Sequence, residues 1–273
     1  MKQEHILKKP ILIKESLFLK SIKLAKSNPN KIGLMLLFDV LFIIAAFSLN
    51  SILQYFAQSI AITQPLWSII TFIVISLVYY LLMLLVYSFF KYLVLDYIKS
   101  LFEKSSFSFN RLGQFYGLNV VLAAIFFASI LLFDYAIRYI QIQYWPWVFV
   151  SIAVPYLILF YVMVNTSHTL FYSGSSIKDS LRNGLKITFM KLKAYRETIL
   201  VMIIAALILW LLFFGAGYLI RLVASKNYSL YLSAYAYNKQ ATIIVFDVVL
   251  YFVILINRIT FYGIMKENDI YER

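Results

Sequence analysis

Cysteine is absent from the 273-residue chain, histidine occurs only twice, and charged residues make up just 14% of the total. The lack of cysteine excludes disulfides, thiolate metal sites and cysteine nucleophiles. The two histidines, His5 and His168, leave little for imidazole metal chemistry. A soluble domain carries about a quarter charged residues. The shortage of charge therefore argues against a water-soluble fold, and no metal or other cofactor is expected.

Apolar residues take the place of the missing charge: 63% of the chain is hydrophobic and its mean hydropathy is +0.83. The first 31 residues hold eight lysines and no long apolar core. A cleavable signal peptide is therefore not expected, and the first spanning helix has to serve as the insertion signal. We predict an all-α polytopic membrane protein.

Six apolar runs are long enough to cross a bilayer as helices of about 20 residues each. They are residues 32–57, 67–91, 113–138, 145–171, 198–221 and 242–265. The predicted domain organisation is a basic amphipathic cytoplasmic segment (1–31), a six-helix transmembrane domain (32–265) and a cytoplasmic tail (266–273). Spans must be helical, because lipid offers no partner to a free backbone group.

The distribution of basic residues predicts the orientation of these spans. Of the 25 lysines and arginines, 21 fall on the side that carries both termini, and only Arg138, Arg221, Lys226 and Lys239 fall on the other. Basic loops stay in the cytoplasm. We therefore expect a multi-pass cell-membrane protein with both termini cytoplasmic. A net charge of +13 distributed in this way favours a membrane surface over nucleic acid.

Basic amphipathic segments precede the first and fifth spans. Residues 16–26 set Leu17, Phe18, Ile22, Leu24 and Ala25 against Lys20, Lys23 and Lys26. Residues 176–193 set Leu181, Leu185, Phe189 and Leu192 against Lys178, Arg182, Lys186 and Lys193, after a capping box of Ser176 and Asp179. These basic side chains are expected to lie on anionic head groups of the cytoplasmic leaflet. The alternative is that they are only positive-inside loops.

A repeat is also suggested, because the Ser-rich segment before the third span resembles these two helices weakly. Three units of surface helix plus helical hairpin are therefore predicted. The aromatic stretch "NYSLYLSAYAYNK" is expected to form either a short helix on the outer leaflet or a loop.

The order of basic helix, Asn28-Pro29 and apolar run resembles a broad group of uncharacterised prokaryotic six-helix membrane proteins. These are similar to the membrane domain attached to some glycerophosphodiester phosphodiesterases. The resemblance covers the overall plan of the chain, and the catalytic barrel has no counterpart in it. The resemblance therefore implies neither hydrolase activity nor any site residue.

Polar residues of four spans are predicted to share one layer, about 10 Å from the inner ends of the helices at 1.5 Å per residue. The layer consists of Asp39, Asn119, Asn165, Asn257 and Arg258. A carboxylate inside a membrane usually faces protein or water and has a partner. Arg258 is the cation expected to pair with Asp39, since a guanidinium can donate two hydrogen bonds to a carboxylate.

Three interpretations of this layer stay open. The pair and the asparagines can join helices to each other, or they can line a cavity that opens to the cytoplasm. Alternatively, Arg258 extends to the interface and never meets Asp39. His168 is expected at the interface near the inner end of span four.

The outer half carries its own charges. Asp134 and Arg138 are four residues apart and should pair on one helix face. Asp247 is expected to join them or to face an outer vestibule, and Pro155 should kink span four.

These features favour a non-enzymatic protein that organises membrane lipid or assembles with a membrane-protein partner. A small-solute or lipid transporter with a polar inner-half cavity is the alternative. An enzyme would require a cluster of acids, histidines or metal ligands, and the sequence shows none.

Overall fold

The computed structural model describes residues 16–59, 65–105, 107–190, 192–224 and 226–267, which form helices and their connections. Residues 1–15 of the basic segment and 268–273 of the tail lie outside the described part. The elements are α1 (Leu17–Ser27), α2 (Pro29–Ser59), α3 (Pro65–Ser100), α4 (Phe109–Ile137), η1 (Ile142–Tyr144), α5 (Trp145–Val148), η2 (Phe149–Ala153), α6 (Val154–Tyr172), α7 (Ile177–Met190), α8 (Leu192–Ala224) and α9 (Tyr228–Glu267).

Six helical segments are long and apolar enough to cross a membrane, which confirms the predicted all-α polytopic fold. They are Pro29–Phe56, Ile69–Ser100, Phe109–Ile137, Ile142–Tyr172, Tyr195–Ala224 and Tyr228–Lys266. Each contains one of the six apolar runs, apart from a residue or two at some ends. Most are longer than the runs, because polar residues at the ends continue the helix. At 1.5 Å per residue the 40 residues of α9 extend about 60 Å, twice the thickness of a hydrocarbon core of about 30 Å.

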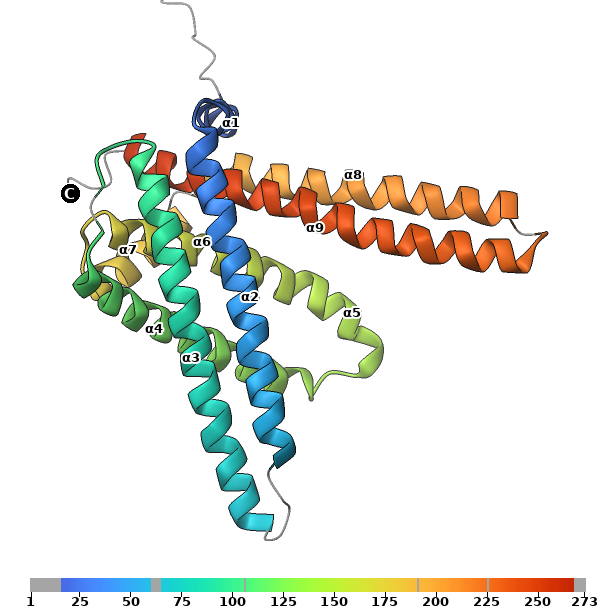
Figure 1. Cartoon of the computed structure of the whole chain (residues 1–273), viewed down its shortest axis with the longest axis horizontal. Coiled ribbons are helices and arrows are strands. Elements are labelled where there is room, and N and C mark those ends of the chain that lie inside the picture. Colours follow the sequence, from blue (N-terminus) through green and yellow to red (C-terminus); the bar gives the residue numbers. More distant parts are fainter. Residues whose placement is uncertain (1–15, 60–64, 106, 191, 225, 268–273) are drawn as a thin grey trace, which may run out of the picture.

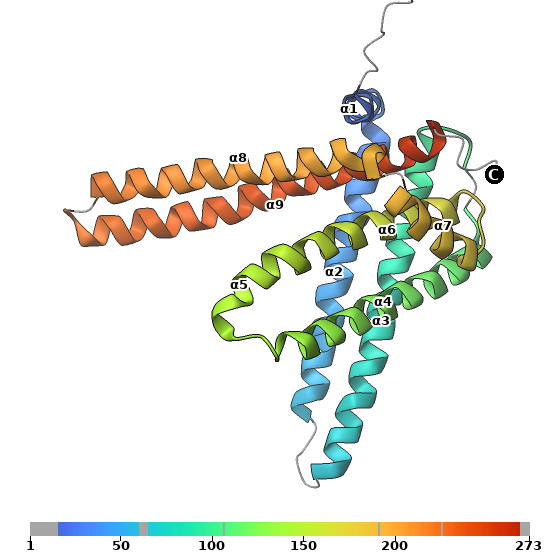
Figure 2. The same ribbon diagram turned by 180° about the vertical axis from the view of Figure 1, so that it is seen from behind.

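The six segments form three hairpins, here called arms, that leave a common hub (Figure 1). The first arm is α2–α3, the second runs from α4 through α5 to α6, and the third is α8–α9. The third arm runs across the direction of the first, and the view from behind shows the same divergence (Figure 2). Within the first and third arms the two helices contact each other extensively.

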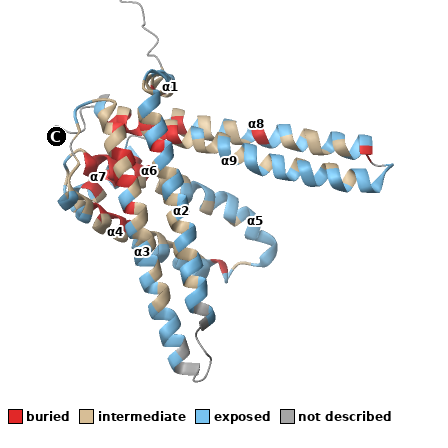
Figure 3. Cartoon of the chain, viewed as in Figure 1, coloured by how far each residue is buried: buried red, intermediate tan, exposed pale blue. Residues whose placement is uncertain are grey.

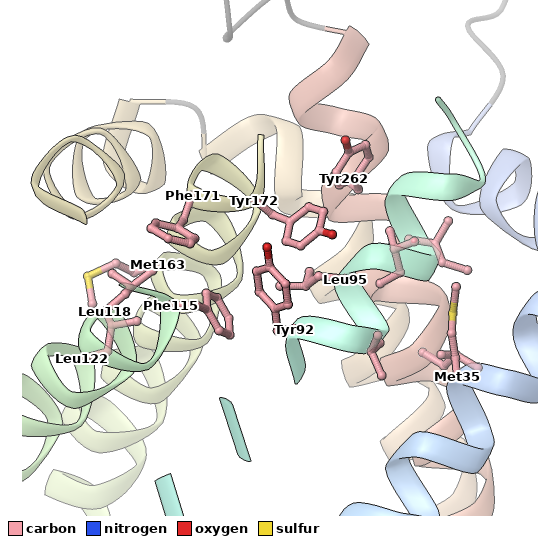
Figure 4. Close-up of a cluster of buried hydrophobic side chains, with 14 residues drawn as sticks. Met35, Tyr92, Leu95, Phe115, Leu118, Leu122, Met163, Phe171, Tyr172 and Tyr262 are labelled. Atoms are coloured by element: carbon pink, nitrogen blue, oxygen red, sulfur yellow. The ribbon is translucent and has the colours of Figure 1, made fainter. Parts of the chain in front are cut away.

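The hub holds most of the buried residues, whereas the arms are largely exposed away from it (Figure 3). Its largest apolar cluster takes Met35 from α2, Tyr92 from α3, Phe115 from α4 and Leu255 from α9. The ring of Tyr92 lies between those of Phe115 and Tyr172, at centroid distances of 5.5 and 4.9 Å (Figure 4). In contrast, no more than 17% of the most apolar stretch of any span is buried by the rest of the chain.

The surface helices α1 and α7 both pack on the hub. The hydroxyl of Ser16 caps α1 by accepting from the Leu19 amide at 3.1 Å, and it donates to Glu197 at the start of α8. The predicted capping residues of α7 are in contact: the Asp179 amide donates to the Ser176 hydroxyl at 3.1 Å, and the Asp179 carboxylate accepts from that hydroxyl at 2.7 Å instead of from the Ser176 amide. Both helices therefore begin where the sequence predicts.

The face that α7 turns to the hub differs from its predicted apolar face. Ser180, Gly184, Ile187 and Thr188 are buried, whereas Leu185 and Phe189 are 49% and 63% exposed. Gly184 allows this close contact, since a Cβ there would lie 2.2 Å from the Ser167 Oγ of α6. The small residues face protein together with Ile177, Leu181 and Ile187, whereas Leu185, Phe189 and the basic side chains face outward.

Two local predictions are wrong. Tyr228, at the start of the aromatic outer stretch, begins α9, so the stretch is neither a separate surface helix nor a loop. Before the second arm α3 simply continues to Ser100, and no separate surface helix occurs in the described residues between it and α4. The repeat therefore consists of three hairpins with surface helices before the first and third.

The predicted distortion of span four takes a specific form. Residues 149–153 make a π-helical turn, η2, which ends two residues before Pro155. Proline has no N–H for the α-helical hydrogen bond, so the wider turn lets the chain bend as it enters α6 (Figure 1).

Candidate functional site

Asp39 of α2 and Arg258 of α9 meet in the hub. Arg258 Nη1 lies 2.6 Å from Asp39 Oδ2, and the Tyr251 hydroxyl donates to the same oxygen at 2.9 Å. The two charged side chains are 16% and 18% exposed in the isolated chain. Arg258 therefore does not extend to the interface, and the first and third arms are joined by an ion pair. The contribution of Tyr251 could not be inferred from the sequence, since its hydroxyl is one of 22.

Asn119 of α4 belongs to a second group of polar contacts. Its amide donates to the Ser88 hydroxyl of α3 at 2.9 Å, and its Oδ1 lies 2.7 Å from His168 Nε2 of α6. All three side chains are buried, so the expectation of an interfacial His168 is wrong. The hydrogen bond to Asn119 and the ring of Phe115, at 4.9 Å, hold His168 inside the hub.

The two other asparagines of the layer behave differently from each other. Asn165 donates to the Tyr161 carbonyl of its own helix at 2.9 Å. Asn257 is fully buried, and neither its Nδ2 nor its Oδ1 has a hydrogen-bond partner among the described residues. The hydroxyl of Tyr161 lies near Asn257 and likewise has no hydrogen-bond partner among the described residues.

Lys91 of α3 is a buried cation that sequence reasoning missed. Its side chain is 8% exposed and makes no hydrogen bond or ion pair with the described residues. The sequence places the end of span two at Lys91, whereas α3 continues for nine residues to Ser100. Lys91 consequently lies about 14 Å from the helix end instead of at the interface. It is three residues after Ser88, and this spacing puts the two on one helix face.

These groups form one polar cluster inside the hub. The charges of Arg258 and Asp39 act on Lys91, and those of Lys91 and Arg258 act on His168. The cluster, which we call the hub polar cluster, consists of Asp39, Lys91, Asn119, Tyr161, His168, Tyr251, Asn257 and Arg258. Five helices contribute to it. Asp39 pairs with Arg258, and Lys91 has no carboxylate partner among the described residues.

The outer charges occupy two separate places. Asp134 and Arg138 make an ion pair across one helical turn and are both exposed. Asp247 has no ion-pair partner among the described residues and lines a cavity of about 750 Å³ between α8 and α9, together with Arg221 and Lys239. Asp247 thus faces an open groove of its own arm.

The basic surface residues lie on the helices that cover the hub. Lys23 and Lys26 of α1 are exposed, as are Lys178, Arg182 and Lys186 of α7. Lys20 of α1 is half-buried and lines a small cavity with Lys266. The side chain of Lys193 lies outside the described part of the structure.

The fold and its polar cluster define the chain as a helical membrane protein of three hairpins joined at one end. Comparisons with protein-family models, curated proteins and solved structures find no match. The resemblance to the membrane domain of glycerophosphodiester phosphodiesterases therefore stays a prediction. Among the described residues no three His, Asp or Glu side chains are grouped so as to hold a metal ion.

Proposed function

We propose that this chain is a non-enzymatic membrane protein that organises lipid or assembles with other membrane proteins. One observation carries the proposal: the hub is packed and contains the buried polar groups, whereas the outer parts of all three arms are apolar and uncovered. A bilayer requires spanning helices to run roughly side by side, with tilts up to about 40°. The diverging arms therefore have to swing together in a membrane or accommodate lipid or partner helices between them.

The surface helices support attachment of the hub to a membrane face. On α7, the exposed Leu185 and Phe189 adjoin the exposed Lys178, Arg182 and Lys186. An interfacial helix has this combination, with its apolar face in the acyl boundary and its basic face among head groups. Each basic residue near an anionic surface contributes about 1 kcal/mol. We therefore place α1 and α7 on the cytoplasmic leaflet, with both chain termini on that side.

Cysteine accessibility tests this orientation cleanly, because the chain has no cysteine of its own. Lys226→Cys lies in the turn between α8 and α9, and Lys178→Cys lies on α7 at the hub. In intact cells a membrane-impermeant maleimide should label the Lys226→Cys variant and spare the Lys178→Cys variant, and lysis should expose both. The reverse labelling pattern would overturn the orientation.

Photo-crosslinking tests the assembly role. A photoreactive residue at Leu132 in the second arm or Leu212 in the third is 70% or 62% exposed in the isolated chain, whereas Leu255 in the hub is buried. In cell membranes the two arm positions should each yield one protein adduct of reproducible mass, and Leu255 should yield only crosslinks within the chain. Adducts with lipid alone at both arm positions would contradict assembly.

A transporter is the second candidate function, and the buried Lys91 and Asn257 favour it. An unpaired cation and an unpartnered amide inside a membrane protein commonly mark a pathway or binding site. Solute or lipid movement by the purified protein in liposomes would establish this candidate, provided that Lys91→Gln abolishes it and that Lys104→Gln, in an exposed connection, does not.

A further inference from the structure

The hub polar cluster holds two basic side chains, Arg258 and Lys91, but only one carboxylate among its described residues, that of Asp39. Asp39 already accepts hydrogen bonds from Arg258 and Tyr251. Lys91, 8% exposed, has no partner among the described residues. A buried ion without a counter-charge costs several kcal/mol. A negative charge beside Lys91 would stabilise its ammonium form.

Neutral polar groups in the same cluster also lack partners. They are both amide atoms of Asn257, the hydroxyl of Tyr161 and the Nδ1 of His168. The large majority of buried side-chain polar atoms in proteins are hydrogen-bonded, so several unpartnered atoms in one cluster are consistent with a bound ligand or water. Asn257 and Tyr161 can donate through N–H and O–H, and Asn257 immediately precedes Arg258 on α9.

Arg258 has donor capacity to spare. A guanidinium carries five N–H groups, and the Asp39 carboxylate accepts one hydrogen bond from them, from Nη1. Since Arg258 is 18% exposed and Asp39 16%, this edge of the cluster is open to the surroundings of the chain.

We propose that the hub polar cluster binds one phosphate group, held by Lys91, the free N–H groups of Arg258 and the Asn257 amide. Phosphate fits better than a spherical anion, because its several oxygens can accept from several fixed donors at once. The group belongs either to a phospholipid head group that enters between the arms or to free inorganic phosphate. This site goes beyond the proposed organising function and does not require it.

The test measures ligand-dependent stabilisation of the full chain in detergent. The thermal unfolding midpoint is recorded with phosphatidylglycerol, with phosphatidylcholine, with inorganic phosphate and with sodium chloride of equal ionic strength. Wild-type protein should be stabilised by phosphatidylglycerol or by inorganic phosphate, and which of the two acts identifies the source. Equal stabilisation by chloride, or none by any addition, would overturn the site. Stabilisation by both phospholipids alike would show a phosphodiester site that does not select for lipid charge.

Four variants separate the site from general stability. Lys91→Gln and Asn257→Leu should each weaken binding at least tenfold, and Lys91→Arg should restore most of it. Without ligand, Asn257→Leu should be at least as stable as wild type, because it removes two orphaned buried atoms. Lys104→Gln, on the exposed connection after α3, should bind like wild type. Unchanged affinity in both Lys91→Gln and Asn257→Leu would refute the proposal even if one of them folds poorly.

Discussion

Arg258 and Asp39 are 219 residues apart in the chain and 2.6 Å apart in the hub, where they join the last spanning helix to the first. The pair connects the third arm to the first. Helix α9 packs on α1 and contacts α2 through this ion pair. A guanidinium and a carboxylate inside a membrane protein are costly singly and acceptable together. The pair therefore favours one arrangement of the arms over others.

Tyr251 should make a measurable contribution to this pair. Tyr251→Phe removes the hydroxyl that donates to Asp39 at 2.9 Å and changes little else. Hydrogen bonds between membrane helices contribute about 0.6 kcal/mol on average and up to about 1.7. We expect a loss of about 1 kcal/mol in the free energy of unfolding, measured by titration of the purified protein with a denaturing detergent. Tyr237→Phe, at an exposed position of α9, is the matched control. Equal losses of unfolding free energy in the two variants would show that the Tyr251 hydroxyl does not stabilise the ion pair.

Gly184 should tolerate no side chain. The Cβ of Gly184→Ala would lie 2.2 Å from Ser167 Oγ and 3.3 Å from Ser167 Cα, so α7 would have to move away from α6. Overpacking of this kind costs about 1–3 kcal/mol. Gly113→Ala has nothing within 4 Å of its new Cβ and should instead stabilise α4 by up to about 1 kcal/mol.

The same detergent titration measures both glycine variants. Opposite signs are expected, and Ser167→Ala should partly rescue Gly184→Ala because it removes the nearest atom. A neutral Gly184→Ala would show that α7 is not held against α6 as the structure has it.

A disulfide should join α1 to the end of α9. Thr260 Oγ1 donates to Ser21 Oγ at 2.9 Å, and both side chains are buried. Sulfur atoms at these positions would lie close enough for the 2.05 Å bond after small rotations. Because native cysteine is absent, Ser21→Cys combined with Thr260→Cys should form a single intramolecular crosslink under mild oxidation.

The crosslink is detected on a gel with a maleimide of high mass, because cysteines joined in a disulfide do not react with it and the band does not shift. The control pair combines Ser21→Cys with Ser48→Cys, which lies about 28 Å along α2 from its start and away from the hub. Comparable crosslinking in the two pairs would indicate that α1 is not docked on α9.

Hydropathy and charge could predict the six spans, the capping residues of α7 and the pairing of Asp39 with Arg258. Apolar length predicts a spanning helix because lipid leaves the backbone no other conformation. The Asp39 pairing follows because one carboxylate and one guanidinium occupy the same depth in different spans. In these cases the sequence of each span, and the depth of its charged residues, is sufficient for the prediction.

Other features depend on where helices end and how they pack. The sequence alone predicts that Lys91 lies at the interface, because it does not show that α3 continues to Ser100. The buried face of α7 consists partly of small residues, and the spacing of its large apolar residues predicts a different face. His168 becomes buried only because α4 brings Asn119 to it. The divergence of the arms depends on tertiary contacts that no residue pattern contains.

A charge swap at the ion pair tests the central claim most directly. Asp39→Arg and Arg258→Asp each place like charges together, and breaking a buried pair costs about 3–5 kcal/mol. The folded yield and detergent-unfolding midpoint of both single variants should therefore fall sharply, while the double variant recovers at least half of the loss. Single variants that accumulate and unfold like wild type, or a double variant whose loss equals the sum of the two, would contradict the account.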